Sequence, residues 1–284
     1  MRPMAMTPSK SFFHKFQERW TQTGSLVCVG LDSDIAQLPV CVQKTDNPIF
    51  EFNRRIIDAT ADYTACYKPN LAFYLSDGLR GYEALLQTLM YIPSEIPVII
   101  DCKVGDIGNT MEAYVEGFFG IAGCDAITVN PLMGSDVLKA LLKRENSFGF
   151  VLCLTSNPSA RDYLLGTSSQ SDSGNSKADL AATIAKDVNN YPVERIGCVI
   201  GATQTSDLKR MRELLPGRLF LVPGIGAQGG DLASVLKYAI SSKEQPKILI
   251  NSSRGIIFKD KSENFAMAAA SEAKKLHQEI LNHL

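Results

Sequence analysis

Short apolar runs alternate with longer amphipathic segments along almost the whole chain. The runs have the length of strands and are apolar at successive positions, which is typical of a parallel sheet covered by helices on both faces. Eight strands are predicted in this way: LVCVGLD from Leu26, YTACYKP from Tyr63, PVIID from Pro97, DAITVN from Asp125, FGFVLCLT from Phe148, IGCVIG from Ile196, RLFLVP from Arg218 and KILINS from Lys247.

The segments between these strands repeat apolar residues with the period of a helix. Eight strand–helix units within about 250 residues match a (β/α)8 TIM barrel, and we expect an extra helix before the first strand. An open doubly wound sheet is the alternative, but it does not require eight evenly repeated units. Because no linker divides the chain, residues 1–284 are predicted to form one barrel domain. The predicted helices include residues 50–60, 78–90, 110–122, 179–190, 231–240 and about 263–281.

One stretch departs from this alternation. Residues 156–176 are rich in Ser, Asp and Gly and follow the fifth strand. A loop of this length within a compact domain is usually a functional lid or a surface insertion. Since the loops after barrel strands surround the active site, we favour a lid.

Composition narrows the classes of function. A net charge of -1 and the lack of a basic tract argue against a nucleic-acid partner. The first residues lack the apolar core of a secretory signal, and no run reaches the roughly 20 apolar residues that span a membrane. The seven cysteines include no CxxC pair, and most sit in apolar runs. These features predict a cytoplasmic protein in a reducing compartment.

Charged residues stand where three neighbouring strands end. Asp32 ends the first strand, Lys68 lies near the end of the second, and Asp101 and Lys103 follow the third. A barrel places its active site at these carboxyl ends, and residues i and i+2 of a strand point to one face. We therefore expect the four side chains to form a row of alternating charge. An ion-pair network that only closes the barrel is the alternative, but apolar side chains would do this at lower free energy.

Two residues beyond this row have an ordinary explanation. Asp106 precedes the helix predicted from Thr110, so Asp106 is typical of a turn and Thr110 of a helix N-cap.

No metal site is predicted, because the three histidines lie in the terminal helices and no cysteine or histidine cluster has ligand spacing.

The last two strands carry a second signal. The seventh is followed by PGIGAQGGD, with four glycines, and the eighth by NSSRGI, with Arg254. Glycines allow backbone N–H groups to approach an anion, and arginine binds phosphate through two hydrogen bonds. Loops after strands 7 and 8 form the usual phosphate site of this barrel. The sequence thus predicts a phosphorylated small molecule as the ligand.

These motifs together resemble one family. Asp-x-Lys-x-x-Asp at 101–106, followed by IGNT, and PGIGAQGGD at 223–231 are similar to orotidine 5'-phosphate decarboxylases. VGLDSD, YKPNLAFY, TVNPLMG and TSNPS resemble the longer bacterial branch of that family, and the likeness covers about residues 29–258. It implies conversion of orotidine 5'-monophosphate (OMP) to uridine 5'-monophosphate (UMP) and carbon dioxide without a cofactor. It also implies a homodimer with shared active sites.

The resemblance implies a role for each residue of the row. Lys103 would protonate the C6 carbanion that departing carbon dioxide leaves, and Asp101 would sit beside the substrate carboxylate. Lys68 and Asp32 would hold the ribose hydroxyls.

The resemblance also assigns residues outside the row. Asp106 and Thr110 would act in the partner subunit's site, contrary to their ordinary explanation. The other substrate-binding residues would be Ser156 at the pyrimidine edge, Gln228 and Arg254 at the phosphate, and Asn130, Gly229 and Gly230.

Two other functions stay open on the sequence. A magnesium-dependent sugar-phosphate decarboxylase or aldolase of the same superfamily would share Asp-x-Lys-x-x-Asp, but would carry an acidic metal ligand near the position of Lys68. A catalytically silent binder of nucleotide phosphates would keep the phosphate loops and leave OMP unchanged.

Overall fold

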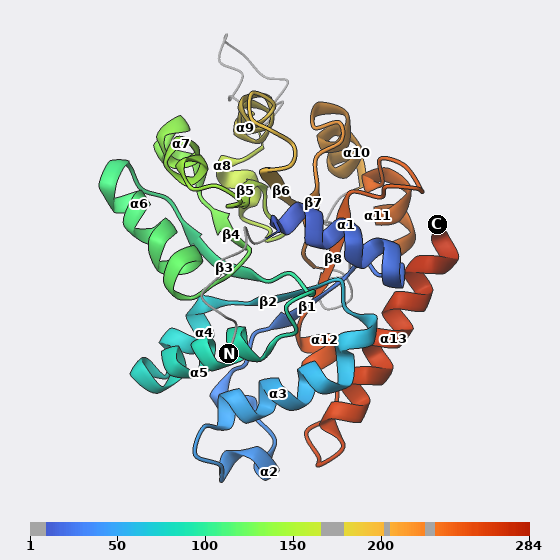
Figure 1. Ribbon diagram of the computed structural model, residues 1–284. Helices are drawn as coiled ribbons and strands as arrows, with labels where there is room; N and C mark the ends of the chain where they lie inside the picture. Colours follow the sequence, from blue (N-terminus) through green and yellow to red (C-terminus); the bar gives the residue numbers. More distant parts are fainter. Residues whose placement is uncertain (1–9, 166–178, 202–204, 225–230) are drawn as a thin grey trace.

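The eight strands form one parallel barrel in a computed structural model that describes residues 10–165, 179–201, 205–224 and 231–284. Their order is β2-β1-β8-β7-β6-β5-β4-β3, and isolated bridges Tyr67–Val98 and Asn70–Asp101 close the circle between β2 and β3 (Figure 1). The predicted (β/α)8 barrel is confirmed. The strands are β1 (Val27–Leu31), β2 (Cys66–Pro69), β3 (Ile99–Val104), β4 (Ala126–Val129), β5 (Gly149–Leu154), β6 (Ile196–Ile200), β7 (Phe220–Val222) and β8 (Ile248–Ser252).

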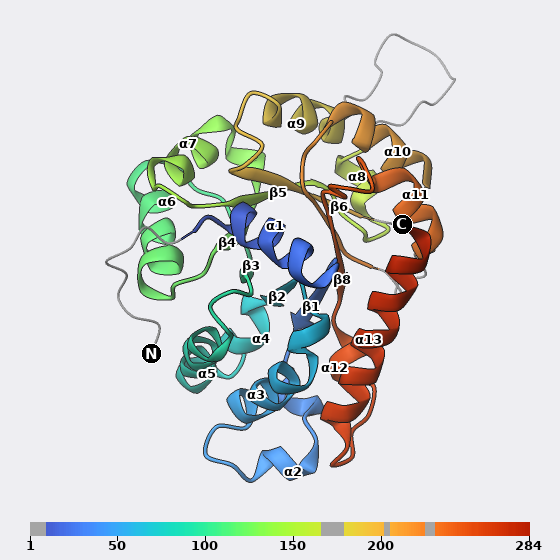
Figure 2. The ribbon, with the colours of Figure 1, turned by 45° about the vertical axis from the view of Figure 1, so that its right-hand side comes forward.

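A helix of at least eight residues follows each strand, and these helices cover the outside of the sheet (Figure 2). Asp179 and Asp231 start two of them, because each carboxylate accepts a hydrogen bond from a first-turn backbone N–H. These helices are α3 (Pro48–Thr60), α5 (Gly78–Tyr91), α6 (Gly108–Val115), α7 (Ser135–Lys143), α9 (Leu180–Val188), α10 (Thr205–Leu214), α11 (Leu232–Ala239) and α13 (Phe265–His283). Shorter elements are η1 (Ile35–Gln37), α2 (Val40–Gln43), η2 (Ala61–Tyr63), α4 (Leu71–Leu75), η3 (Glu116–Ile121), η4 (Pro131–Met133), α8 (Ala160–Tyr163) and α12 (Arg254–Ile257).

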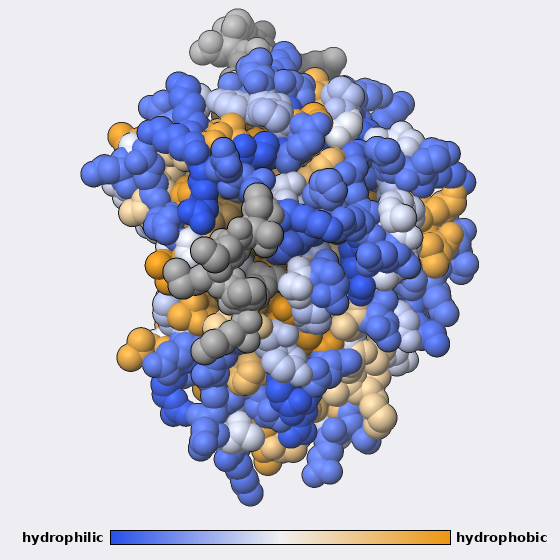
Figure 3. Space-filling model, viewed as in Figure 1, coloured by the Kyte–Doolittle hydropathy of each residue, from blue (hydrophilic) through white to orange (hydrophobic). Residues whose placement is uncertain are grey.

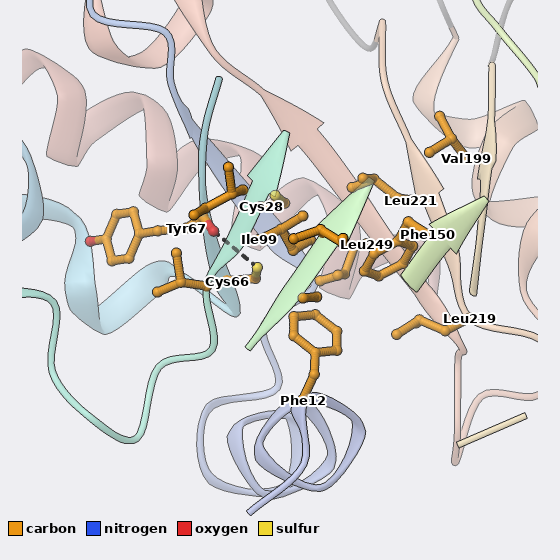
Figure 4. Packing of buried hydrophobic residues seen from close by; sticks show 14 of the residues in the cluster. Phe12, Cys28, Cys66, Tyr67, Ile99, Phe150, Val199, Leu219, Leu221 and Leu249 are labelled. Carbon is orange, nitrogen blue, oxygen red and sulfur yellow. Dashed lines mark hydrogen bonds between the residues drawn. The ribbon is translucent and has the colours of Figure 1, made fainter. Parts of the chain in front are cut away.

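The extra N-terminal helix, α1 (Phe12–Thr23), closes the N-terminal end of the barrel. Its Phe12 ring lies 5.0 Å from the ring of Phe148 and 5.4 Å from that of Phe150. Figure 4 shows Phe12 and Phe150 among the buried side chains. Lys15 forms a 2.6 Å ion pair with Asp125 at the same end. With this end filled, the carboxyl ends of the strands are left for a ligand.

Two sequence predictions need correction or completion. Helix α6 begins at Gly108 with Ile107 as its N-cap, so the prediction that Thr110 caps it is wrong. Gly108 has φ of +52°, and glycine adopts this backbone conformation without strain, which allows the helix to begin two residues earlier.

The predicted lid at 156–176 contains α8, whose Ala160 is buried, and the lid residues from 166 onward lie outside the described part of the chain.

None of the helices in the described ranges combines the length and the apolar composition that crossing a membrane requires.

Candidate active site

The four charged residues at the ends of β1, β2 and β3 form the predicted row. Lys68 Nζ lies 3.8 Å from Asp32 Oδ1 and 3.1 Å from Asp101 Oδ2. On the other oxygen, Asp101 Oδ1 accepts a hydrogen bond of 2.6 Å from Lys103 Nζ. The order is therefore carboxylate, ammonium, carboxylate, ammonium, and we call these residues the charged row.

The inner members of the charged row are buried. The side chains of Lys68 and Asp101 are 5% and 11% exposed. Burial disfavours the charged form of Lys68, but the charges of Asp101 and Asp32 outweigh it and raise the pKa of the ammonium. Burial also disfavours the Asp101 carboxylate, but Lys68 and Lys103 outweigh it and lower its pKa. Both groups therefore carry their charges at neutral pH.

The third strand is irregular where it carries the row. Ile100 pairs with Ile127, but the next pair is Val104 with Val129, so a single residue of β4 faces residues 101–103. Lys103 has φ of +49°, which is uncommon for a residue other than glycine. The prediction that side chains alternate regularly along the strand past Ile100 is therefore wrong, although the side chains of Lys103 and Asp101 do meet.

Thr128 is the residue of β4 that faces this irregularity, and the sequence analysis missed it. Its hydroxyl donates to Asp101 Oδ1 at 2.8 Å and accepts from the backbone N–H of Lys103 at 2.9 Å. The available signal was a polar residue within the apolar run DAITVN.

A cavity of about 420 Å³ lies over the charged row. All four residues of the row line it, and Arg254 and Gly224, from the loops after β8 and β7, line it as well. Arg254 is exposed and lines the cavity, so its guanidinium is accessible to an anion there. Ser156 and Thr128 also line the cavity, together with apolar side chains of Leu152, Val199 and Leu221.

Two glycines let the loops of the cavity approach the barrel. A Cβ on Gly201, directly after β6, would lie 2.7 Å from the backbone of Ser156. A Cβ on Gly30 would overlap the side chain of Ser253, next to Arg254. Larger residues at these positions would displace loops that line the cavity.

Several predicted substrate-binding residues lie elsewhere. The Asn130 side chain caps η4 by accepting from Leu132 N, and it lines a neighbouring cavity instead. Asp106 accepts from Ile107 N, and neither it nor exposed Thr110 lines the cavity over the row. Gln228, Gly229 and Gly230 lie outside the described residues.

The geometry of the charged row fits an array of ion pairs better than a metal centre. The Lys68 ammonium lies between Asp32 and Asp101, where a divalent cation would need to sit to bridge these two carboxylates. Within the described ranges, no three His, Cys, Asp or Glu side chains are grouped so that they could hold a metal ion.

Comparison with known proteins identifies the family. The profile of the family described as "Orotidine 5'-phosphate decarboxylase / HUMPS family" matches residues 25–269. An orotidine 5'-phosphate decarboxylase of Bacteroides fragilis (strain YCH46) is 41% identical over 263 residues, which covers 92% of this chain and 93% of that protein. One of Flavobacterium johnsoniae is 39% identical over 269 residues, or 94% of this chain and 96% of the relative.

Solved structures agree with this match. OMP decarboxylase of Leishmania donovani superposes with a TM-score of 0.79 at 33% identity, covering 96% of this chain and 98% of the other. A protein of Toxoplasma gondii described as a putative orotidine-monophosphate decarboxylase gives a TM-score of 0.82 at 31% identity, covering 97% and 100%.

Proposed function

The chain belongs to the orotidine 5'-phosphate decarboxylase / HUMPS family, and we propose that its charged row decarboxylates OMP to UMP and carbon dioxide. This reaction is the last step of de novo UMP biosynthesis. The observation that carries the proposal is that the Asp101 carboxylate pairs with two lysines, Lys68 and Lys103, in the lining of one cavity. Lys68 also pairs with Asp32. Arg254 lines the same cavity.

Lys103 is the proposed proton donor. Loss of carbon dioxide leaves an electron pair on C6 of the pyrimidine, and an ammonium held in advance beside C6 stabilises that charge as it develops. The 2.6 Å bond to Asp101 fixes the direction of the Lys103 Nζ. When C6 takes a proton from Lys103, UMP forms and the lysine is left neutral, to be protonated again from solvent.

The remaining residues bind the substrate. Arg254 grips the phosphate through charge-assisted hydrogen bonds, together with the loop that contains Gln228, Gly229 and Gly230. Lys68 and Asp32 hold the ribose hydroxyls, and Ser156 contacts the pyrimidine edge. Binding energy at the phosphate, remote from C6, orients the ring over Lys103 and so contributes to turnover.

The direct test is the change in OMP absorbance with purified protein. We expect loss of the OMP absorbance, formation of UMP and the same rate in the presence of a metal chelator. Activity that disappears with the chelator and returns with magnesium would indicate the metal-dependent alternative. Binding of UMP without any decay of OMP would indicate the silent binder.

We further propose that the chain acts as a homodimer whose subunits share active sites. Exposed apolar side chains lie in the segments that follow β2, β3 and β4, and we call them the apolar rim. Among them, Ile107 is 53% and Leu132 is 70% exposed. Figure 3 shows apolar side chains along the edge where α4, α5 and α6 lie in Figure 1. Exposed apolar surface of this kind is typical of a protein interface. Asp106 and Thr110 flank Ile107 in the sequence and do not line their own cavity, which supports a role for them across the interface. The rim consists of Leu75, Leu79, Ile107, Tyr114, Leu132 and Met133.

Mixing two inactive variants tests the shared site. Lys103→Ala and Asp106→Ala should each be nearly inactive alone. After subunit exchange, half of the dimers would combine both variants, and each mixed dimer would contain one complete site. The mixture should therefore recover about one quarter of wild-type activity, assuming random pairing of a two-fold dimer.

The matched control mixes Lys103→Ala with Asp101→Ala. Both residues serve the site of their own chain, so no mixed dimer has a complete site and no activity should return. Recovery in the control, or none with Asp106→Ala, would contradict the assignment of Asp106 to the partner subunit.

The setting and the domain organisation are also proposals. We propose that residues 1–284 act as one barrel domain in the cytoplasm. The buried, free thiols of Cys153 and Cys198 support a reducing compartment.

A further inference from the structure

We infer that Thr128 is a positioning residue for the decarboxylation, one that holds both the Asp101 carboxylate and the backbone of Lys103 in their catalytic arrangement. The inference rests on the proposed function of the charged row. Thr128 also lines the cavity, but its hydroxyl is engaged by Asp101 and by the backbone of Lys103, so it acts through these two neighbours.

The irregularity of β3 creates the need for this residue. Between the pairs Ile100–Ile127 and Val104–Val129, three residues of β3 face Thr128 alone. A regular parallel pair would give the Lys103 N–H a backbone carbonyl as its acceptor. Here the N–H donates to the Thr128 hydroxyl at 2.9 Å instead. The side chain of Thr128 thus replaces a missing bond of the sheet.

The same hydroxyl also orients the acid of the row. Its own hydrogen goes to Asp101 Oδ1 at 2.8 Å, the oxygen that also accepts from Lys103 Nζ at 2.6 Å. Asp101 Oδ2 is held by Lys68 at 3.1 Å. Thr128 therefore fixes the rotation of the carboxylate, and the carboxylate in turn directs the Lys103 ammonium.

Burial makes this arrangement rigid. Thr128 is 1% exposed, so water cannot replace its hydroxyl without a change of structure. Lys103, in contrast, is 49% exposed and has φ of +49°, a conformation that the neighbouring structure must hold in place. A small shift at Thr128 would move the ammonium relative to C6, and proton transfer depends steeply on that geometry.

The deciding variant is Thr128→Val, which keeps the shape of the side chain and removes the hydroxyl. We expect kcat for OMP to fall about 10- to 100-fold, or about 1.4 to 2.7 kcal/mol at about 1.36 kcal/mol per tenfold change. KM should change little, because the phosphate and ribose contacts remain. Thr128→Ser should restore kcat. A matched control, Thr64→Val, removes a buried hydroxyl that bonds Thr60 O before β2 begins, and should leave kcat unchanged.

A second readout does not depend on activity. Hydrogen exchange of the Lys103 amide should speed up about 3- to 10-fold in Thr128→Val, as expected from the loss of one hydrogen bond, and return in Thr128→Ser. If Thr128→Val does not fold, Thr128→Ala serves for both measurements.

Several outcomes would overturn the inference. These are an unchanged kcat in Thr128→Val, an unchanged Lys103 exchange rate, or a Thr128→Ser variant as slow as Thr128→Val. A wild-type protein that leaves OMP unchanged would refute the proposed function instead, and the exchange measurement would still decide whether Thr128 holds Lys103.

Discussion

Replacing Asp101 with Asn tests whether the charged row is held together by its central carboxylate. The carboxylate is 11% exposed and accepts hydrogen bonds from Lys68, Lys103 and Thr128. Asn keeps the shape and removes the charge, so the nearly buried Lys68 ammonium keeps only Asp32, at 3.8 Å. Breaking a buried ion pair costs about 3–5 kcal/mol. Because Lys103 can turn toward solvent, we expect the lower end, about 3 kcal/mol.

The assay is thermal unfolding at several pH values. A chain of 284 residues has an unfolding entropy of about 0.6 kcal/mol/K, so the variant should melt about 5 °C below wild type at pH 7. The pKa of Asp101 is lower in the folded state, so its contribution is complete above the unfolded pKa of about 4 and is lost as the pH falls further. The difference in Tm should therefore stay constant from about pH 5 to 8 and narrow below about pH 4.

The control is Asp136→Asn, which removes an exposed carboxylate paired with Lys139 at 3.3 Å and should hardly change Tm. The reasoning would be refuted by an Asp101→Asn variant that melts at or above the wild-type temperature at pH 7. A Tm difference that does not narrow in acid would also refute it. Decarboxylation should be lost in the variant at temperatures where it stays folded.

Two further variants test the cavity. Arg254→Ala should lower kcat/KM for OMP about 100-fold, because charge-assisted hydrogen bonds are lost, and should leave the slow reaction of phosphate-free orotidine unchanged. The control Lys259→Ala, which removes a cation paired with Glu272, should change neither rate. An equal loss for both substrates in Arg254→Ala would argue against a phosphate contact. Gly201→Ala should raise KM and cost about 1–3 kcal/mol of stability, because its Cβ would lie 2.7 Å from the Ser156 backbone. Gly117→Ala, whose Cβ would meet open space, should do neither, and normal kinetics in Gly201→Ala would show that the loop can move without consequence.

The sequence by itself determined the architecture and the placement of the charges. Successive apolar residues can only be buried on both faces of a strand, so the eight runs indicated a parallel sheet covered by helices. Polar residues directly after such runs must emerge at one end of the barrel, and for this reason Asp32, Lys68 and Arg254 were correctly expected to share a cavity. The cost of burying unpaired charge made their pairing predictable as well.

Only the tertiary structure decided which atoms meet. Asp101 is bonded by Lys68 and by Thr128, which lie 33 and 27 residues away in the chain, and both contacts depend on the register between strands. The period of a strand contains no information on a shift in that register, so the left-handed backbone at Lys103 and the role of Thr128 were not foreseen. The same reason applies to Asn130, whose position after β4 was clear from the sequence, while the cap that turns its side chain away from the charged row was not.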